Sequence, residues 1–256
     1  MKFSYSRLET FANCPKQYDF RYIQKLKTLP NQDANNALYL GTALHLGLET
    51  GDVKQAIDNY IGNYYVVTDE IVNECIKLEY LIPKVYELLP PGVCEIEISD
   101  QEFIGYIDRL VYLYTDESGI NHYSIMDYKY SNNIDRYLES KQLHIYKYYF
   151  ELTHPNTVVD SLYYVFVPKF SIRQKKSETL YEFRQRLKEH LESSEIKVIE
   201  IDYDVNSITQ FQSCCQQLKK VKSFPKNPTK LCNWCEFQQY CESDGKEDWM
   251  IIAKTK

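Results

Sequence analysis

YSIMDYKYSNNID, residues 123–135, is an apolar, strand-like run that ends on an aspartate, a tyrosine and a lysine. Successive side chains of a strand alternate in direction, so Asp127 and Lys129 should project from the same face, roughly 6.5–7 Å apart along the chain. A solvated strand end that carries an ordinary ion pair is the simplest interpretation of an isolated D-x-K. The surrounding sequence decides whether the two charges instead belong to a site.

The composition predicts a cytoplasmic protein with no membrane partner. The chain has 256 residues, enough for a substantial core, and shows neither a signal-like start nor a run of about 18 apolar residues. Its eight cysteines, without a secretory signal, favour buried thiols or a metal site over disulfides. The net charge is −6, but basic residues are grouped in 168–176 and 219–230. Such grouping is compatible with a nucleic-acid partner.

The order of predicted elements indicates an α/β fold. Helical patterns occupy 3–28, with Ser4 or Ser6 as cap and an interruption at Pro15, then 36–51, beginning near Leu40, and 52–89. A strand meander follows at 93–99, 101–115 and 122–131, and then helix 138–153, strand 158–168, helix 176–193, strand 195–204 and helix 205–222. We therefore expect one domain, 1–256, in which a helical part (1–92) precedes a core with a mixed sheet flanked by helices (93–222) and a cysteine-containing tail (223–256).

Acidic residues recur on the three strands of the meander. They are Glu97, Asp108 and Asp127. Strands adjacent in sequence are usually adjacent in space, so these carboxylates should meet at one edge of the sheet. Converging carboxylates need a cation, and their hard oxygens suit Mg²⁺ or Mn²⁺. A neighbouring lysine then fits phosphodiester hydrolysis, because it can orient water or neutralise charge on a phosphate.

Five motifs, in this order along the chain, resemble those of one nuclease family. They are YSRLETFANCPKQYDFRY (5–22), LGTALHLGLE (40–49), GYIDRLVY (105–112), IMDYKYS (125–131) and QLHIYKYY (142–149). Together they resemble the PD-(D/E)XK nuclease superfamily, in particular its RecB-like and AddB-like exonuclease branch. Each motif is short and degenerate, so the order and the spacing carry the resemblance. It implies a restriction-endonuclease-like core.

The resemblance also implies roles for individual residues. Asp108, Asp127, His45 and the backbone carbonyl of Tyr128 would bind Mg²⁺ or Mn²⁺. Lys129 would be the catalytic lysine, and Gln142 and Tyr146, one helical turn apart, would lie beside it. Glu97 is an additional candidate acid, although Glu95 shares its face and Glu102 is near in sequence.

The cysteines suggest a second metal centre. CNWCEFQQYC (232–241) places Cys232, Cys235 and Cys241 in a C-x₂-C-x₅-C cluster, whose spacing leaves Zn²⁺ and an iron–sulfur cluster both open. The resemblance favours a [4Fe–4S] cluster held by these three residues and Cys14, which would join the two ends of the chain. The other cysteines are interpreted as buried thiols: Cys75, Cys94, Cys214 and Cys215.

Three functions follow as hypotheses. The first is a metal-dependent DNA exonuclease acting on single strands or duplex ends, in recombination, repair or phage DNA processing, and then located in the host cytoplasm if phage-encoded. The second is a DNA-binding subunit or CRISPR-adaptation nuclease within a larger complex, with a recombination, helicase or adaptation protein as partner. The third is a zinc-binding interaction protein. In the first two, Phe170 and Phe224 of the basic stretches would stack on bases, and a homo-oligomer is compatible with the branch.

Overall fold

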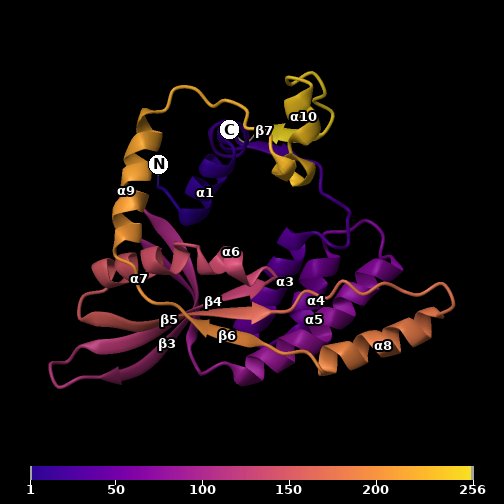
Figure 1. Ribbon diagram of the computed structural model, residues 1–256, viewed down its shortest axis with the longest axis horizontal. Helices are drawn as coiled ribbons and strands as arrows, with labels where there is room; N and C mark the ends of the chain where they lie inside the picture. The colour runs from indigo at the N-terminus through magenta and orange to yellow at the C-terminus, as the bar shows by residue number, and fades with distance from the viewer. Residues whose placement is uncertain (1, 255–256) are drawn as a thin grey trace. The chain divides into compact units, whose positions relative to one another are not determined.

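The computed structural model describes residues 2–254, and the chain divides into two compact units. The first unit comprises residues 1–31, 99–105 and 205–256, and the second comprises 32–98 and 106–204. The first unit therefore collects both ends of the chain, whereas the second contains the central stretch with the acidic strands (Figure 1). The single domain expected from the sequence stays a prediction, but its internal boundaries differ from those of the two units.

A mixed five-stranded sheet, in the order β2-β3-β4-β5-β6, is the larger of the sheets in the described residues. Its strands are β2 (Val93–Ser99), β3 (Ile104–Thr115), β4 (Asn121–Tyr130), β5 (Thr157–Val167) and β6 (Lys197–Glu200). β3 and β4 pair antiparallel, β4 and β5 parallel, and β5 and β6 antiparallel. The three strands of the expected meander are consecutive neighbours, so that prediction is confirmed. The last strand is shorter than the predicted 195–204.

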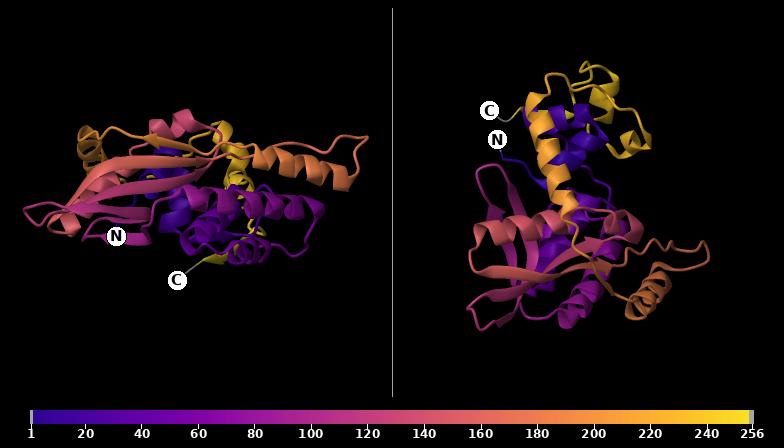
Figure 2. Two further views of the ribbon diagram at one scale, coloured as in Figure 1. Left: turned by 90° about the horizontal axis from the view of Figure 1, so that it is seen from below. Right: turned by 60° about the vertical axis from the view of Figure 1, so that its left-hand side comes forward.

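Helices cover both faces of this sheet (Figure 2). On one face lie α3 (Ala37–Thr50), α4 (Val53–Ile61) and α5 (Asp69–Leu88), whose buried residues form one core with Met126 and Tyr128 of β4. α3 begins three residues before the predicted Leu40, because the side chain of Asn36 accepts hydrogen bonds from the first turn. Gly51 ends it in the left-handed conformation, as glycine readily does.

The segment between β4 and β6 supplies the remaining helices of this unit. α6 (Ile134–Leu138) precedes α7 (Gln142–Thr153), so the helix predicted over 138–153 begins later and follows a short separate one. α7 packs against β4 and β5, on the face opposite to α3. α8 (Leu180–Glu192) starts with a capping box between Thr179 and Glu182 and packs against α5. The observed architecture is the predicted α/β sheet flanked by helices.

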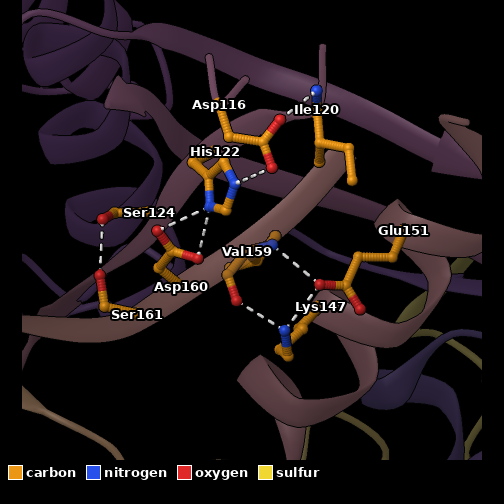
Figure 3. Close-up of polar contacts among 9 residues, drawn as sticks. All are labelled: Asp116, Ile120, His122, Ser124, Lys147, Glu151, Val159, Asp160 and Ser161. Atoms are coloured by element: carbon orange, nitrogen blue, oxygen red, sulfur yellow. Dashed lines mark hydrogen bonds and ion pairs between the residues drawn. The ribbon is translucent and has the colours of Figure 1, made fainter. Parts of the chain in front are cut away.

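A polar cluster ties the β3–β4 turn to the start of β5 (Figure 3). His122 Nδ1 lies 2.9 Å from Asp160 Oδ1, and His122 Nε2 lies 3.6 Å from Asp116 Oδ2. The ring of Tyr114 stacks on the imidazole with centroids 4.3 Å apart. The two carboxylates, through hydrogen bonds first, raise the pKa of His122 above its ordinary value. Charge and stacking therefore both hold this end of the sheet together.

The first unit joins sequence-distant segments. Its elements are α1 (Tyr5–Asn13), α2 (Pro15–Tyr18), the π-helix η1 (Asp19–Ile23), β1 (Leu26–Thr28), α9 (Asn206–Lys220), the 3₁₀ helix η2 (Lys230–Trp234), α10 (Gln238–Glu242) and β7 (Ile251–Lys254). β1 pairs antiparallel with β7, and Phe20, Leu26 and Phe237 form a small core beneath them. Ser4 caps α1, and the helix breaks before Pro15 as predicted.

Among residues 2–254, no helix combines the length and the hydropathy needed to span a bilayer.

Candidate active site

Two acidic residues lie side by side on the central strands. Arg109 of β3 pairs with Met126 of β4, so the next positions of this antiparallel register, Asp108 and Asp127, are also neighbours. Asp108 is 9 % exposed and Asp127 1 % exposed. The backbone N–H of Tyr128 donates to Asp108 Oδ2 at 2.7 Å, which fixes that carboxylate against β4. The sheet register thus brings together two of the residues predicted from the sequence.

Lys129 links Asp127 to helix α7. Its Nζ forms an ion pair with Asp127 Oδ2 and donates to Gln142 Oε1 at 3.1 Å. Gln142 Nε2 in turn donates to the hydroxyl of Tyr146 at 2.9 Å. Gln142 and Tyr146 therefore share a helix face, one turn apart, as the sequence predicts. The result is a continuous polar chain from β4 to α7 through four predicted site residues.

Two aromatic rings flank the ammonium group of Lys129. Nζ lies 5.4 Å from the ring centre of Tyr137 in α6 and 5.5 Å from that of Tyr164 in β5. Both distances fall within the range of a cation–π interaction. Burial by itself lowers the pKa of Lys129, but Asp127 first, and then Asp108, outweigh it and raise the pKa above its ordinary value. Lys129 is thus held as a charged ammonium at a fixed position.

His45 reaches the same place from α3. Its Nε2 lies 3.1 Å from the backbone carbonyl oxygen of Tyr128, and its Nδ1 lies 3.3 Å from Asp108 Oδ1. A carbonyl oxygen only accepts hydrogen bonds, so Nε2 carries the proton of this contact. Burial alone lowers the pKa of His45, but the carboxylates of Asp108 and Asp127 outweigh it and raise the pKa to about 9.

This donor set fits a divalent cation. Burial, and then the neighbouring Asp108, raise the pKa of Asp127 to about 6 even though Lys129 opposes the shift. The two adjacent carboxylates offer the hard oxygen donors that Mg²⁺ and Mn²⁺ prefer. His45 and the carbonyl of Tyr128 lie within hydrogen-bond distance of each other at the same point. His45 thus contacts both Asp108 and the carbonyl of Tyr128, and Asp127 lies next to Asp108 on the neighbouring strand; their role as ligands stays a prediction.

For the additional acid on β2, the structure differs from the expectation of Glu97. Glu95, with His45 and Asp108, forms a group whose potential ligand atoms all lie within 4.8 Å of one another. Glu97 is not a member of that group. Its Oε2 instead accepts a hydrogen bond of 3.3 Å from the hydroxyl of Tyr106 at the exposed surface. The structure therefore favours Glu95 over Glu97 as the additional acid.

Arg109 lies next to Asp108 but points to the other face of the sheet, where it supports the site. The sequence analysis did not predict this role. It is 5 % exposed and donates from Nε to the hydroxyl of Tyr128 at 2.5 Å. Its other nitrogens donate to the backbone carbonyls of Pro90 and Leu48, both at 2.9 Å. The available signal was a buried arginine directly after Asp108, between the apolar residues of β3. Arg109 thereby fastens the helix that carries His45 to the strand that carries Asp127.

The four cysteines expected to hold a cluster all belong to the first unit. Cys14 caps α2, Cys232 lies in η2, Cys235 directly follows it, and Cys241 lies in α10. Cys14, Cys232 and Cys241 line one pocket of about 470 Å³. Burial first, and then nearby groups including the thiols of Cys14 and Cys232, raise the pKa of Cys235.

Of the cysteines interpreted as buried thiols, Cys215 is buried, but Cys214 is exposed on the outer face of α9.

The phenylalanines of the basic stretches each contact other apolar side chains. Phe224 packs on Tyr18, with ring centres 5.9 Å apart, and meets Phe11 edge to face. Phe170 packs against the core beneath the main sheet. Both rings are half-buried and contact apolar neighbours within their own units, and their stacking on bases stays a prediction. Arg173, Lys175 and Lys176 of the first stretch remain exposed.

Comparison with known proteins adds one finding. No curated protein matches the chain significantly. The sequence model of the PD-(D/E)XK nuclease superfamily, however, matches residues 2–242, nearly the whole chain. That range includes both acidic strands, Lys129, α7 and His45. The chain therefore belongs to the PD-(D/E)XK nuclease superfamily.

Proposed function

We propose that this protein is a metal-dependent DNA exonuclease of the RecB-like branch, which hydrolyses phosphodiester bonds of single strands or duplex ends. The observation that carries the proposal is the polar chain that runs from Asp127 through Lys129 and Gln142 to Tyr146, beside Asp108 and His45. Each of these residues has a charge or a hydrogen-bonding group suited to phosphodiester hydrolysis, and none of them is far from the others. Membership of a nuclease superfamily supports the reaction class.

His45, Asp108, Asp127 and the carbonyl of Tyr128 are the residues that would hold Mg²⁺ or Mn²⁺. When bound, such a cation supplies Lewis-acid stabilisation of the negative charge that develops on the phosphate. Asp108 is preorganised by the N–H of Tyr128, and His45 lies beside the carbonyl of the same residue; His45 would lose a proton on binding the cation. Preorganised dipoles and charges need no reorganisation during the reaction.

Lys129 is proposed to act on the scissile phosphate. Its ammonium group has three N–H donors, of which Asp127 and Gln142 engage two. The remaining donor can serve a phosphate oxygen or hold the attacking water. In the reaction a water oxygen bonds to phosphorus and loses a proton, the ester P–O bond breaks, and the departing oxygen takes up one proton, so that the two products together contain the atoms of one water. Gln142 and Tyr146 keep Lys129 in place while this happens.

The choice of an exonuclease of DNA rests on the resemblance. The upstream histidine, the D-x-K strand and the Q-x-x-x-Y helix occur here in the order typical of that branch, and the structure joins Lys129, Gln142 and Tyr146 by hydrogen bonds. Exposed basic residues at 173–176 offer contacts to the phosphate backbone that do not depend on sequence.

We also propose that Cys14, Cys232, Cys235 and Cys241 hold a [4Fe–4S] cluster. Three of them line one pocket, and the fourth is close enough to be influenced by two of the others. Four thiols that gather without a disulfide form a donor set suited to iron or zinc. The cluster would join α2 to the C-terminal segment, so that its ligands close a loop of more than 200 residues.

Metal analysis tests the cluster. Protein purified without oxygen should contain iron and inorganic sulfide and absorb near 400 nm, whereas Cys235→Ala should lose both. Cys214→Ala is the matched control, because Cys214 is exposed and outside the cluster. Zinc in place of iron in the wild-type protein would contradict the proposal.

End-labelled DNA tests the nuclease. The anaerobically purified protein is incubated with single-stranded DNA labelled at either end, in Mg²⁺ or Mn²⁺, beside Asp127→Ala and Lys129→Ala. We expect degradation by the wild-type protein only, and the label that disappears first gives the polarity. Undiminished activity of either variant would overturn the proposed site. Binding of DNA without degradation by any of the three proteins would favour a subunit that needs a partner.

A further inference from the structure

Apolar side chains are exposed on the loop between α4 and α5. Tyr65 is 80 % exposed, and Val66 and Val67, which follow it, are exposed as well. Single apolar side chains are normal at a protein surface, but a contiguous group of them is typical of an interaction site. The loop therefore presents an apolar patch, 65–67, whose surroundings indicate what it binds.

The patch is held by the segment that precedes α3. The side chain of Gln32 accepts a hydrogen bond of 3.0 Å from the N–H of Tyr65 and donates to the carbonyl of Asn63 at 3.2 Å. The hydroxyl of Tyr64 donates to the carbonyl of Asp33 at 3.0 Å. The backbone at Tyr65 is thus fixed, while its ring remains exposed to solvent.

Lys169 reaches the same segment from the end of β5. Its Nζ lies 3.4 Å from the carbonyl oxygen of Asn35 and 6.0 Å from the ring centre of Tyr130. Gln32 and Asn35 are three residues apart, so at most about 11 Å of chain separates the contact of Tyr65 from that of Lys169. All these residues belong to the second unit. An exposed aromatic ring and a cation are therefore attached to one short segment.

The backbone of Lys169 is also joined to the strand that carries the proposed active site. Asn132 donates from Nδ2 to the carbonyl of Lys169 at 2.6 Å and accepts at Oδ1 from its N–H at 2.8 Å. The next carbonyl, of Phe170, accepts a hydrogen bond of 2.8 Å from the buried ammonium group of Lys77. Asn132 follows Lys129 by three residues. Lys169 is thus fixed close to the end of β4 at which Lys129 lies.

We propose that Tyr65 and Lys169 bind a single strand of DNA beside the active site, with Lys169 on a backbone phosphate and the ring of Tyr65 stacked on an unpaired base. The proposal rests on the proposed function and names the form of the substrate at this surface. Proteins that bind single strands combine basic groups along the backbone with aromatic rings that stack on bases. The exposed basic residues at 173–176 continue the positive charge beyond Lys169. In a duplex the bases are already paired and stacked, so Tyr65 has no free base to meet.

Binding of fluorescein-labelled oligothymidylate of about 12 nucleotides tests the surface. Fluorescence anisotropy is measured in EDTA, which withholds the cation that cleavage needs, on the full-length wild-type protein, Tyr65→Ala, Tyr65→Phe and Tyr112→Ala. Tyr65→Ala should weaken binding by at least about fivefold, the loss of one stacked base. Tyr65→Phe should bind within about twofold of the wild-type protein, because phenylalanine keeps the ring.

Tyr112→Ala is the matched control for an exposed tyrosine. Tyr112 is 54 % exposed and pairs with Tyr123 near the start of β4, whereas Lys169 lies at the end of that strand. Its substitution should change the affinity for the oligonucleotide by less than about twofold. A loss as large as that in Tyr65→Ala would overturn the assignment of the strand to this surface.

The salt dependence of the same binding isolates Lys169. Each phosphate that a protein neutralises on a single strand contributes about −0.7 to the slope of log K against log salt concentration. Lys169→Met should therefore make the slope shallower by about 0.7, and Tyr65→Ala should leave it unchanged. An unchanged slope in Lys169→Met would overturn the phosphate contact.

The outcomes separate failure of the surface from failure of the proposed function. If Tyr65→Ala binds the oligonucleotide like the wild-type protein, and the wild-type protein degrades it in Mg²⁺, the inference is overturned, the nuclease stands, and the patch is left for a protein partner. An equal loss of affinity for a blunt duplex in Tyr65→Ala overturns the role of an unpaired base. If the wild-type protein neither binds nor degrades the oligonucleotide, both the inference and the proposed function fail.

Discussion

Arg109 should contribute more to stability than any exposed arginine of this protein. Its guanidinium is buried and makes three hydrogen bonds, to the Tyr128 hydroxyl and to the carbonyls of Pro90 and Leu48, at 2.5–2.9 Å. Arg109→Met keeps most of the apolar volume but leaves all three acceptors without this donor. The substitution therefore isolates the hydrogen bonds from the packing.

The magnitude follows from these contacts. A hydrogen bond with a charged donor contributes about 1.5–3 kcal/mol net, and removal of one partner from a buried charged network typically costs about 3–5 kcal/mol. Three such bonds would sum to about 4.5–9 kcal/mol, and we take the smaller figure for the network, because methionine avoids the desolvation that the guanidinium suffers. The free energy of unfolding should thus fall by about 3–5 kcal/mol. For a chain of this size the melting temperature should fall by about 6–20 °C.

Urea and thermal denaturation of the wild-type protein and the variant measure this loss. Arg173→Met is the matched control, since Arg173 is exposed and the same substitution there should change the free energy by less than about 0.5 kcal/mol. A double-mutant cycle with Tyr128→Phe isolates one contact and should give a coupling of about 1–2 kcal/mol. A loss at Arg109 no larger than at Arg173, or zero coupling with Tyr128, would refute the reasoning.

Two further predictions concern His122, at one end of the main sheet, and Gln142, on helix α7 beside Lys129. Asp160 and Asp116 raise the pKa of His122, so the stabilisation it gives is full below its unfolded pKa of about 6.5 and is lost as pH rises through the folded pKa. The difference in melting temperature between the wild-type protein and His122→Phe should therefore shrink from pH 6 to pH 9, and a constant difference would contradict this. Gln142→Met removes the acceptor of Lys129 and should lower kcat about 10- to 100-fold with little change in KM. DNA cleavage under single-turnover conditions measures the loss of rate. A change in KM alone would argue against a positioning role of Gln142.

Much of the fold follows from local patterns in the sequence. The alternation in 93–131 predicts β2, β3 and β4 because a half-buried strand repeats every two residues. The same periodicity places Asp127 and Lys129 on one face, where the structure has their ion pair. Proline and glycine mark the ends of α1 and α3 for steric reasons that are equally local. These features need no knowledge of distant contacts.

Other features depend on contacts that no local pattern records. β1 and β7 are three- and four-residue strands more than 200 positions apart, too short to show an alternation. Phe170 and Phe224 look available in a basic stretch, but their rings are packed against residues elsewhere in their units. Glu95 and Glu97 are equivalent on a regular strand, and only the left-handed φ of Glu95 distinguishes them. Nothing next to Arg109 in the sequence indicates its role, because its three acceptors come from separate parts of the chain.

The two faces of the β3–β4 pair divide stability from chemistry. Asp108, Asp127 and Lys129 point to one face, whereas Arg109, which follows Asp108, and Tyr128, which follows Asp127, meet on the other. A shift of one residue in the pairing would exchange the faces, burying carboxylates in the apolar core and exposing the arginine. The hydrogen bond between Arg109 and Tyr128 therefore does more than stabilise the core. It favours the register in which Asp108 and Asp127 are neighbours over the shifted one, together with the backbone pairing of β3 and β4.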